Sequence, residues 1–288
     1  MACPLCGGER AHASWLGTTY YRGREFPYVA CTSCGTLYCA PMPDASTLAE
    51  MYGPDYTQEG GAAGHVENPK EPGRVVEWLA RLAPGTFVDY GCGQGELLTE
   101  AQRKGWQAVG VEFSEDVARA VAARTGAQVF TRAHEQADFP TADVLHIGDV
   151  IEHLTRLDEQ MPEILRLVKP GGLLLAQGPL EANASLFTSV LATARRLRPK
   201  RRTEKAPYHV LLATARGQRE FFRRFGLDEI EYILREVTWP APSGLALADL
   251  RRPRAVGLFT LRRCSQALSA MRPHAWGNRY FYVGRKPN

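Results

Sequence analysis

The chain has 288 residues, enough for one large α/β domain and a small additional module. Hydrophobic residues make up 44% of it and charged residues 23%, which is the balance of an ordinary globular protein and excludes a disordered one. It contains no run of about 18 uncharged apolar residues and no secretory leader, so we expect a cytoplasmic protein without a transmembrane segment.

The formal net charge of +4 is unevenly distributed. Residues 195–288 carry 21 Lys and Arg against 7 Asp and Glu, whereas residues 71–194 carry 10 against 17. A basic last third can bind phosphate, an anionic lipid surface or an anionic substrate. A solvated arginine-rich surface would look the same, so the charge leaves the partner open.

Four of the seven cysteines form two C-x-x-C pairs, Cys3 with Cys6 and Cys31 with Cys34. Two such pairs can bring four thiolates into a tetrahedron around zinc, with no position left for water or substrate. The segment between them is rich in aromatic residues and would form the strands of a small ribbon that the metal stabilises. A redox-active C-x-x-C is the alternative, although paired motifs favour a metal. We therefore predict a structural zinc in a ribbon over residues 1–40.

Residues 41–71 mix prolines and glycines with one short helical stretch at 46–52, and we expect a linker or lid there. Apolar residues at helical spacing predict a helix over 71–82, which Pro84 and Gly85 stop before the first strand.

A short apolar run at 86–88 is followed by Asp89 and by three alternating glycines, Gly91, Gly93 and Gly95. This pattern predicts a strand, a tight turn and a helix whose first amides point at a small polar ligand. The G-x-G-x-G spacing differs from the G-x-G-x-x-G of dinucleotide-binding folds. A second strand over 107–112 ends in Glu112, where a carboxylate can accept hydrogen bonds from both hydroxyls of a ribose.

Strands and helices alternate along the rest of the chain. We expect helices over 96–104, 114–124 and 157–168, and further strands over 127–131, 143–148, 173–177, 227–234 and 279–285. A turn at 169–172 separates the third of these helices from the next strand, and residues 245–271 are expected to be largely helical. This alternation predicts an α/β fold with a doubly wound, mostly parallel sheet that binds ligands at the carboxyl ends of its strands.

Four stretches in order resemble the motifs of class I S-adenosylmethionine-dependent methyltransferases: D-Y-G-C-G-Q-G, V-G-V-E, A-D-V-L-H-I-G-D-V-I-E-H-L and L-V-K-P-G-G-L-L-L. The resemblance covers roughly residues 72–288, which we take as the methyltransferase domain. It implies a seven-stranded Rossmann-like sheet, S-adenosylmethionine as cofactor and methyl transfer as the reaction. The cofactor-binding residues that it implies are Asp89, Gly91, Gly93, Gly95, Glu112, Phe113, Ala133, His134, Asp149 and Val150.

The stretch after the ribbon is similar to one in small-molecule methyltransferases that carry an N-terminal zinc ribbon. This resemblance implies that Tyr56, or else Tyr52, folds over the methionine end of the cofactor, with packing between ribbon and core as the alternative for both. An insertion at 181–206 lies where such enzymes build their substrate cover, and its basic tail at 195–202 either binds an anionic group or complements a helix C-terminus.

Two histidines are candidates for a catalytic base. His153 follows the fourth strand of the sheet in the run D-V-I-E-H-L, and its neutral imidazole can remove a proton from an acceptor. His209 lies in P-Y-H, which resembles a segment that lines the acceptor pocket of related enzymes, although the following V-L-L-A-T departs from their pattern. A structural role is the alternative for both.

Three functions remain open at this point. The first is methylation of a small molecule on O, N or C, such as a sugar or natural-product intermediate, with an acceptor that can be anionic. The second is an RNA methyltransferase that uses the basic last third, although the ribbon itself is not basic and no N-P-P-Y-type signature for a flipped base follows the fourth strand. The third is a non-catalytic, zinc-anchored interaction protein, against which the intact glycines and acids argue.

Overall fold

The computed structural model describes residues 1–52, 72–131, 139–196, 203–237 and 244–288. Contacts divide the chain into two compact units. The ribbon unit comprises residues 1–69, 179–220 and 233–280, and the sheet unit comprises residues 70–178, 221–232 and 281–288. Among the described helices, none is both long and apolar enough to span a bilayer.

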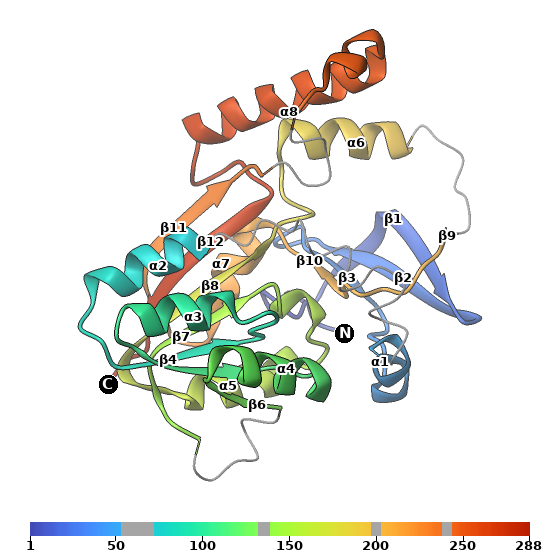
Figure 1. The fold of residues 1–288 in the computed structure, drawn as a ribbon. Coiled ribbons are helices and arrows are strands. Elements are labelled where there is room, and N and C mark those ends of the chain that lie inside the picture. Colours follow the sequence, from blue (N-terminus) through green and yellow to red (C-terminus); the bar gives the residue numbers. More distant parts are fainter. Residues whose placement is uncertain (53–71, 132–138, 197–202, 238–243) are drawn as a thin grey trace. The chain divides into compact units, whose positions relative to one another are not determined.

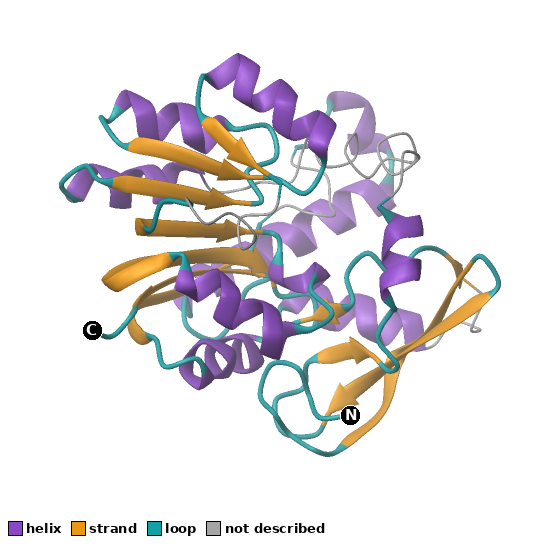
Figure 2. Cartoon of the chain, turned by 90° about the horizontal axis from the view of Figure 1, so that it is seen from below, coloured by secondary structure: helices purple, strands orange, loops and turns teal. Residues whose placement is uncertain are grey.

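A seven-stranded sheet organises the sheet unit, with the order β11-β12-β8-β7-β4-β5-β6. The pairings of β4 with β5 and β7, of β5 with β6 and of β7 with β8 are all parallel. Figure 2 shows helices packed along these strands. The strands are β4 (Thr86–Tyr90), β5 (Gln107–Val111), β6 (Gln128–Phe130), β7 (Ala142–Gly148), β8 (Val168–Pro179), β11 (Asp228–Arg235) and β12 (Arg279–Arg285).

The direction of winding reverses at β4. From β4 the chain steps outward to β5 and β6, and then crosses back to β7 on the other side of β4. The crevice beside the carboxyl ends of β4 and β7 is therefore a topological switch point, the place where open α/β sheets bind ligands. This sheet confirms the predicted doubly wound, mostly parallel fold.

Helices α2 (Pro72–Arg81), α3 (Glu96–Arg103), α4 (Glu115–Thr125) and α5 (Leu157–Arg166) belong to this unit, together with the short 3₁₀ helix η4 (Ile151–His153). Apolar residues of α2, α3 and α4 pack with those of the strands into one buried cluster that includes Leu79, Phe87, Leu98, Val121 and Leu175. Ser114 caps α4 through its side chain and Gly126 ends it in the left-handed conformation, as its sequence predicts.

The ribbon unit contains a five-stranded sheet with the order β10-β3-β2-β1-β9 (Figure 1). Strands β1 (Ala11–Tyr21), β2 (Arg24–Cys31) and β3 (Leu37–Cys39) form the predicted antiparallel ribbon. Its two edge strands come from much later in the chain: β9 (Thr203–Glu204) and β10 (Leu211–Leu212).

The remaining helices are α1 (Ala45–Met51), α6 (Leu186–Arg196), α7 (Ala215–Arg224), η5 (Leu247–Arg251) and α8 (Pro253–Met271). Helices α6 and α8 lie side by side in Figure 1. A buried ion pair joins Arg262 of α8 to Glu236, and the Arg262 guanidinium lies 3.5 Å from the centre of the Phe187 ring.

Candidate functional site

Backbone hydrogen bonds fix the conformation of the glycine loop after β4. Gly91 and Cys92 both donate hydrogen bonds to the carbonyl of Val111, at 2.8 and 3.0 Å, which ties the loop to the end of β5. Gly91 has φ +80°, and a Cβ there would lie 2.5 Å from Cγ2 of Val150. Glycine is required at this position on both counts, and its absent side chain lets the loop backbone approach Val150 closely.

The loop continues into α3 through Gly95, which caps the helix with φ +71°. A Cβ on Gly95 would lie 2.5 Å from Cγ1 of Val121, so the turn also packs tightly against α4. Gly93, with φ +50°, lies between Gly91 and Gly95, and its amide donates a hydrogen bond to the Glu112 carboxylate. Each of the three predicted glycines thus has a positive φ, in alternation with the residues between them.

Glu112 follows β5 and bends back onto this loop. Its Oε2 accepts a hydrogen bond from the Gly93 amide and its Oε1 accepts one from the Ser114 amide, both at 3.0 Å. The side chain is half-buried rather than extended into water. Each carboxylate oxygen can accept more than one hydrogen bond, so the two amides orient Glu112 and leave it able to accept from a diol.

Phe113, the next residue, is 82% exposed, an unusual position for a large aromatic side chain. It lies two residues beyond the end of β5 and directly follows Glu112 in the chain.

A buried chain of three polar side chains lies beneath the loop. Nδ1 of His146 on β7 lies 2.7 Å from Oδ1 of Asp89, and its Nε2 lies 3.1 Å from Nε2 of Gln177 on β8. Because the Gln177 amide nitrogen can only donate, the ring is neutral and donates from Nδ1 to Asp89. Gly148 makes room for the ring, since a Cβ there would lie 2.6 Å from Cε1 of His146. Asp89 is thereby fixed at the root of the loop.

Asp149 and Val150 follow β7 at the same edge of the sheet. Asp149 has φ +54°, rare for a residue with a side chain, and its amide donates to the Gln177 carbonyl at 3.0 Å. This left-handed turn brings Val150 against Gly91. The structure therefore brings together the ends of three strands that the sequence predicted to share a ligand.

His153 ends η4 three residues beyond Val150, whose carbonyl accepts a hydrogen bond from the His153 amide at 3.0 Å. The histidine is half-buried, and Glu152 before it is buried. Its position places it in the sheet unit, at the edge that carries the glycine loop.

The four predicted cysteines lie together in the ribbon unit, with all four sulfur atoms within 4.8 Å of one another. The Sγ atoms of Cys3 and Cys34 are 3.7 Å apart, and those of Cys6 and Cys31 are 3.6 Å apart. A tetrahedral zinc with Zn–S bonds of about 2.3 Å separates its sulfur ligands by about 3.8 Å, so this donor set fits zinc.

Of the four thiols, Cys34 loses its proton most readily, whereas burial raises the pKa of Cys6 to about 11. A hydrogen bond from Cys3 lowers the pKa of Cys34 to about 5, and that shared proton together with burial raises the pKa of Cys3. A thiolate is the form that binds metal.

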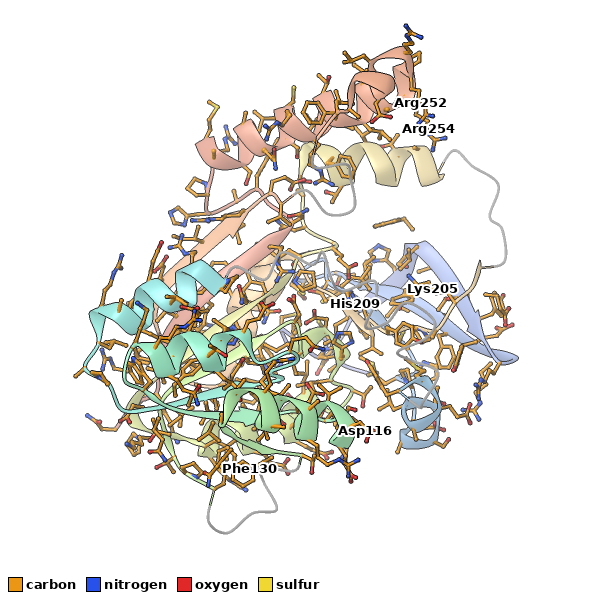
Figure 3. All side chains as sticks on the ribbon, viewed as in Figure 1. Asp116, Phe130, Lys205, His209, Arg252 and Arg254 are labelled. Atoms are coloured by element: carbon orange, nitrogen blue, oxygen red, sulfur yellow. The ribbon has the colours of Figure 1, made fainter. Side chains whose placement is uncertain are left out.

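His209 lies in the ribbon unit between β9 and β10, where Figure 3 labels it. Its Nδ1 lies 2.8 Å from Oε2 of Glu181, and both side chains are partly exposed. A neutral imidazole that donates from Nδ1 to a carboxylate carries its basic lone pair on Nε2. Glu181, 28 residues away in the chain, was not predicted.

The comparisons with known proteins agree with this geometry. The sequence profile of a family described as a methyltransferase domain matches residues 67–232, more than half of the chain. The chain belongs to this methyltransferase family. The resemblance of its ordered motifs to methyltransferases is therefore confirmed.

Curated relatives of the methyltransferase include two ubiquinone biosynthesis O-methyltransferases. The protein of Vibrio cholerae is 32% identical over 116 residues, which cover 38% of this chain and 47% of the relative. The protein of Sinorhizobium medicae is 29% identical over 170 residues, which cover 57% of this chain and 60% of the relative. The chain thus spans about half the length of the curated relatives it matches.

Among solved structures, the plantazolicin methyltransferase BamL in complex with a triazolic desmethylPZN analog and SAH has a TM-score of 0.52. Its sequence is 12% identical, and the match covers 84% of this chain and 95% of that chain. At this identity the likeness concerns the fold of the methyltransferase.

Three predicted cofactor residues, Tyr56, Ala133 and His134, lie outside the described residues. The same holds for residues 197–202 of the basic tail, and the side chains of Arg195 and Arg196 are not described either. Tyr52 is described, and its ring packs edge-on against Tyr208 with centroids 5.9 Å apart.

Proposed function

We propose that the protein transfers a methyl group from S-adenosylmethionine to a hydroxyl of a small molecule. The cofactor supplies a methyl group already activated by its sulfonium, so the protein has to hold the donor, orient the acceptor and remove the acceptor's proton. A sugar or natural-product intermediate is the class of acceptor that we expect.

The cofactor would bind at the edge formed by the glycine loop, Glu112 and Val150. Glu112 is fixed by two amides and can accept from a ribose diol, and Phe113, which follows it in the chain, is exposed. Asp89 and the bend at Asp149 hold the neighbouring strand ends in place. These features support binding of a nucleoside at the switch point of the sheet.

The observation that carries the choice of a hydroxyl is the hydrogen bond between His209 and Glu181. An alcohol or phenol needs a base as the methyl group is transferred, whereas an amine can react once it has lost its proton. A carboxylate on Nδ1 orients the imidazole and stabilises the imidazolium that forms when Nε2 takes the proton. The relatives' name, O-methyltransferase, supports the same choice. His153 is the alternative base.

Zinc at Cys3, Cys6, Cys31 and Cys34 would be structural, because all four positions of a tetrahedral site are filled by sulfur. It would leave no position for a substrate or water, so the zinc would not contact the reacting groups.

The test uses S-adenosylmethionine with a carbon-13-labelled methyl group, incubated with the small-molecule fraction and with the total RNA of a cell extract. Our proposal expects label in the small-molecule fraction, at the chemical shift of a methoxy group. Label in RNA would support the alternative of an RNA methyltransferase, and an N-methyl or C-methyl shift would contradict the hydroxyl acceptor.

The base is tested in the same assay. His209→Ala should lower the transfer rate by about 10²- to 10⁴-fold, with binding of S-adenosylhomocysteine unchanged in calorimetry. His153→Ala is the matched comparison, and a loss of transfer in that variant alone would assign the base to His153.

A further inference from the structure

Both edges of the zinc ribbon are closed by a single later segment of the chain. Strand β9 pairs in parallel with β1, with Thr203 opposite Thr19. Strand β10 pairs antiparallel with β3, with Leu211 opposite Tyr38. The segment 203–212 therefore crosses from one edge of the ribbon to the other, and His209 lies on the crossing (Figures 1 and 3).

Hydrogen bonds attach this crossing segment to the ribbon at both ends. At the β9 end, the Lys205 amide donates to the Tyr20 carbonyl and the Thr19 hydroxyl donates to the Lys205 carbonyl, both at 2.7 Å. At the β10 end, the Cys39 amide donates to the Val210 carbonyl at 3.0 Å.

The ribbon also holds the backbone of His209 itself. The Tyr28 hydroxyl, from the middle strand of the ribbon, donates to the His209 carbonyl at 2.7 Å. Burial raises the pKa of Tyr28, so its hydroxyl keeps the proton that this bond requires. The carbonyl of His209 is thus fixed by the ribbon, while its ring is oriented by Glu181.

A third attachment reaches the cysteine cluster. The Thr214 hydroxyl donates to the carbonyl of Cys34 at 2.7 Å and accepts from the Gly217 amide at 3.0 Å. Gly217 has no room for a side chain, since a Cβ would clash with the Thr36 hydroxyl, and it would lie 3.1 Å from the Cys34 sulfur. The start of α7 therefore packs directly on one of the four proposed zinc ligands.

We propose that the zinc ribbon is the element that positions His209, with Tyr28 and Thr214 as positioning residues. The proposal rests on the role of His209 proposed above and assigns the ribbon a part in methyl transfer beyond its own stability. When bound, the zinc would supply part of the folding free energy of the ribbon. Metal loss would release β3 and Cys34, and with them the crossing segment that carries His209.

The first experiment compares hydrogen exchange in the zinc-loaded and the chelator-treated full chain. We expect protection to fall by roughly tenfold or more at amides 203–217, and to be unchanged at the amides of β4 and β7. Unchanged protection at 203–217 in the metal-free protein would overturn the proposal.

The second experiment removes the hydrogen bond between Thr214 and Cys34 while all four cysteines remain in place. Thr214→Val removes the hydroxyl at nearly constant volume. Thr193→Val is the matched control, since the Thr193 hydroxyl donates to the Ser189 carbonyl of its own helix α6. In the Thr214 variant we expect full zinc content, unchanged affinity for S-adenosylhomocysteine, faster exchange at 203–217 and lower methyl transfer. Wild-type exchange and transfer would overturn the proposal, and this variant decides the matter if the chelated protein unfolds throughout.

Tyr28→Phe tests the same coupling at the His209 carbonyl. We expect its kcat, normalised to the number of S-adenosylhomocysteine-binding sites, to fall without a change in the KM for S-adenosylmethionine. A general loss of stability would instead lower the number of binding-competent molecules and leave the kcat of each one unchanged. Different results would contradict the role of His209 as base and its positioning by the ribbon. Full transfer by His209→Ala would remove the role of His209 and leave the exchange result intact. Unchanged exchange in the metal-free protein and in Thr214→Val would remove the coupling and leave the defect of His209→Ala.

Discussion

Asp89 and His146 form a hydrogen bond of 2.7 Å between Oδ1 and Nδ1, with the two side chains 4% and 1% exposed. The pair joins β4 to β7 at the point where the sheet changes winding direction. Because neither side chain contacts water, each depends on the other to satisfy its buried polar atoms.

Replacing His146 by Leu should therefore destabilise the protein by about 3–5 kcal/mol, because it leaves the Asp89 carboxylate buried without its ring partner. Asp89→Asn should cost less, since its amide oxygen can still accept from Nδ1. Urea unfolding of the full chain measures both, and the control is Asp116→Asn at an exposed position in the first turn of α4. A loss below about 1 kcal/mol for His146→Leu would show that the pair contributes little.

Glu112→Ala should weaken S-adenosylhomocysteine binding by roughly ten- to a hundredfold, as expected from the loss of charge-assisted hydrogen bonds. The affinity of Glu112→Gln for S-adenosylhomocysteine should lie between those of Glu112→Ala and the wild type, because glutamine keeps one acceptor oxygen. Calorimetry provides the measurement, and Glu115→Gln, at an exposed position in the first turn of α4, is the control. A wild-type affinity in Glu112→Ala would contradict the proposed contact between Glu112 and the ribose.

Gly91→Ala combines an unfavourable φ with a clash against Val150. Gly126→Ala isolates the effect of φ, since Gly126 has φ +69° at the end of α4 and a Cβ there would meet no other atom within 4 Å. We expect Gly126→Ala to cost about 1–2 kcal/mol of stability with cofactor binding unchanged, and Gly91→Ala to cost more and to lose binding. The double variant Gly91→Ala with Val150→Ala should recover part of the loss, and no recovery would argue against the steric explanation.

The cysteine cluster predicts one zinc ion per chain, measurable by elemental analysis of the purified protein. Cys31→Ser should lose the metal and with it the protection of β1, β2 and β3 from hydrogen exchange. Cys264→Ser, at an exposed cysteine of α8, should keep both. Full metal content in Cys31→Ser would exclude the four-sulfur site.

Acid stability should depend on Asp143, which accepts hydrogen bonds from the Lys169 ammonium at 2.8 Å and from the Thr86 amide. These bonds hold the pKa of Asp143 below its ordinary value. Its contribution is therefore fully present above the unfolded pKa of about 4 and is lost as the pH falls through the lower folded value. The unfolding free energy of Asp143→Asn should differ from that of the wild type above pH of about 4 and converge with it at lower pH. Exposed Asp228→Asn is the control.

The sequence predicted the sheet and the glycine loop because both depend on local signals. Apolar runs mark β4, β5 and β7, and the spacing of Gly91, Gly93 and Gly95 marks the bend. One boundary was wrong: residues 168–172 were expected to end a helix and form a turn, but β8 already begins at Val168. The Lys169 bond to Asp143 holds this stretch against β7.

The side-chain partners could not be predicted in the same way. His146 and Gln177 are 31 positions apart and meet only through the register of β7 and β8, in which Gly148 lies opposite Gln177. Within its apolar strand, His146 gives no signal of its role. Glu181 as the partner of His209, and the two-residue strands β9 and β10, are likewise visible only in the folded chain, because two residues carry no periodicity.

The strands of the closed ribbon are synthesised at very different times. The hydroxyl of Thr19 and the carbonyl of Lys205 that it reaches are 186 positions apart. In a nascent chain the four cysteines can thus come together early, with β1 and β3 paired to β2. The outer edges of β1 and β3 stay unpaired until β9 and β10 have been synthesised. During that interval the exposed backbone of β1 and β3 can pair with a second nascent copy, so slow translation of the middle of the gene should favour aggregation.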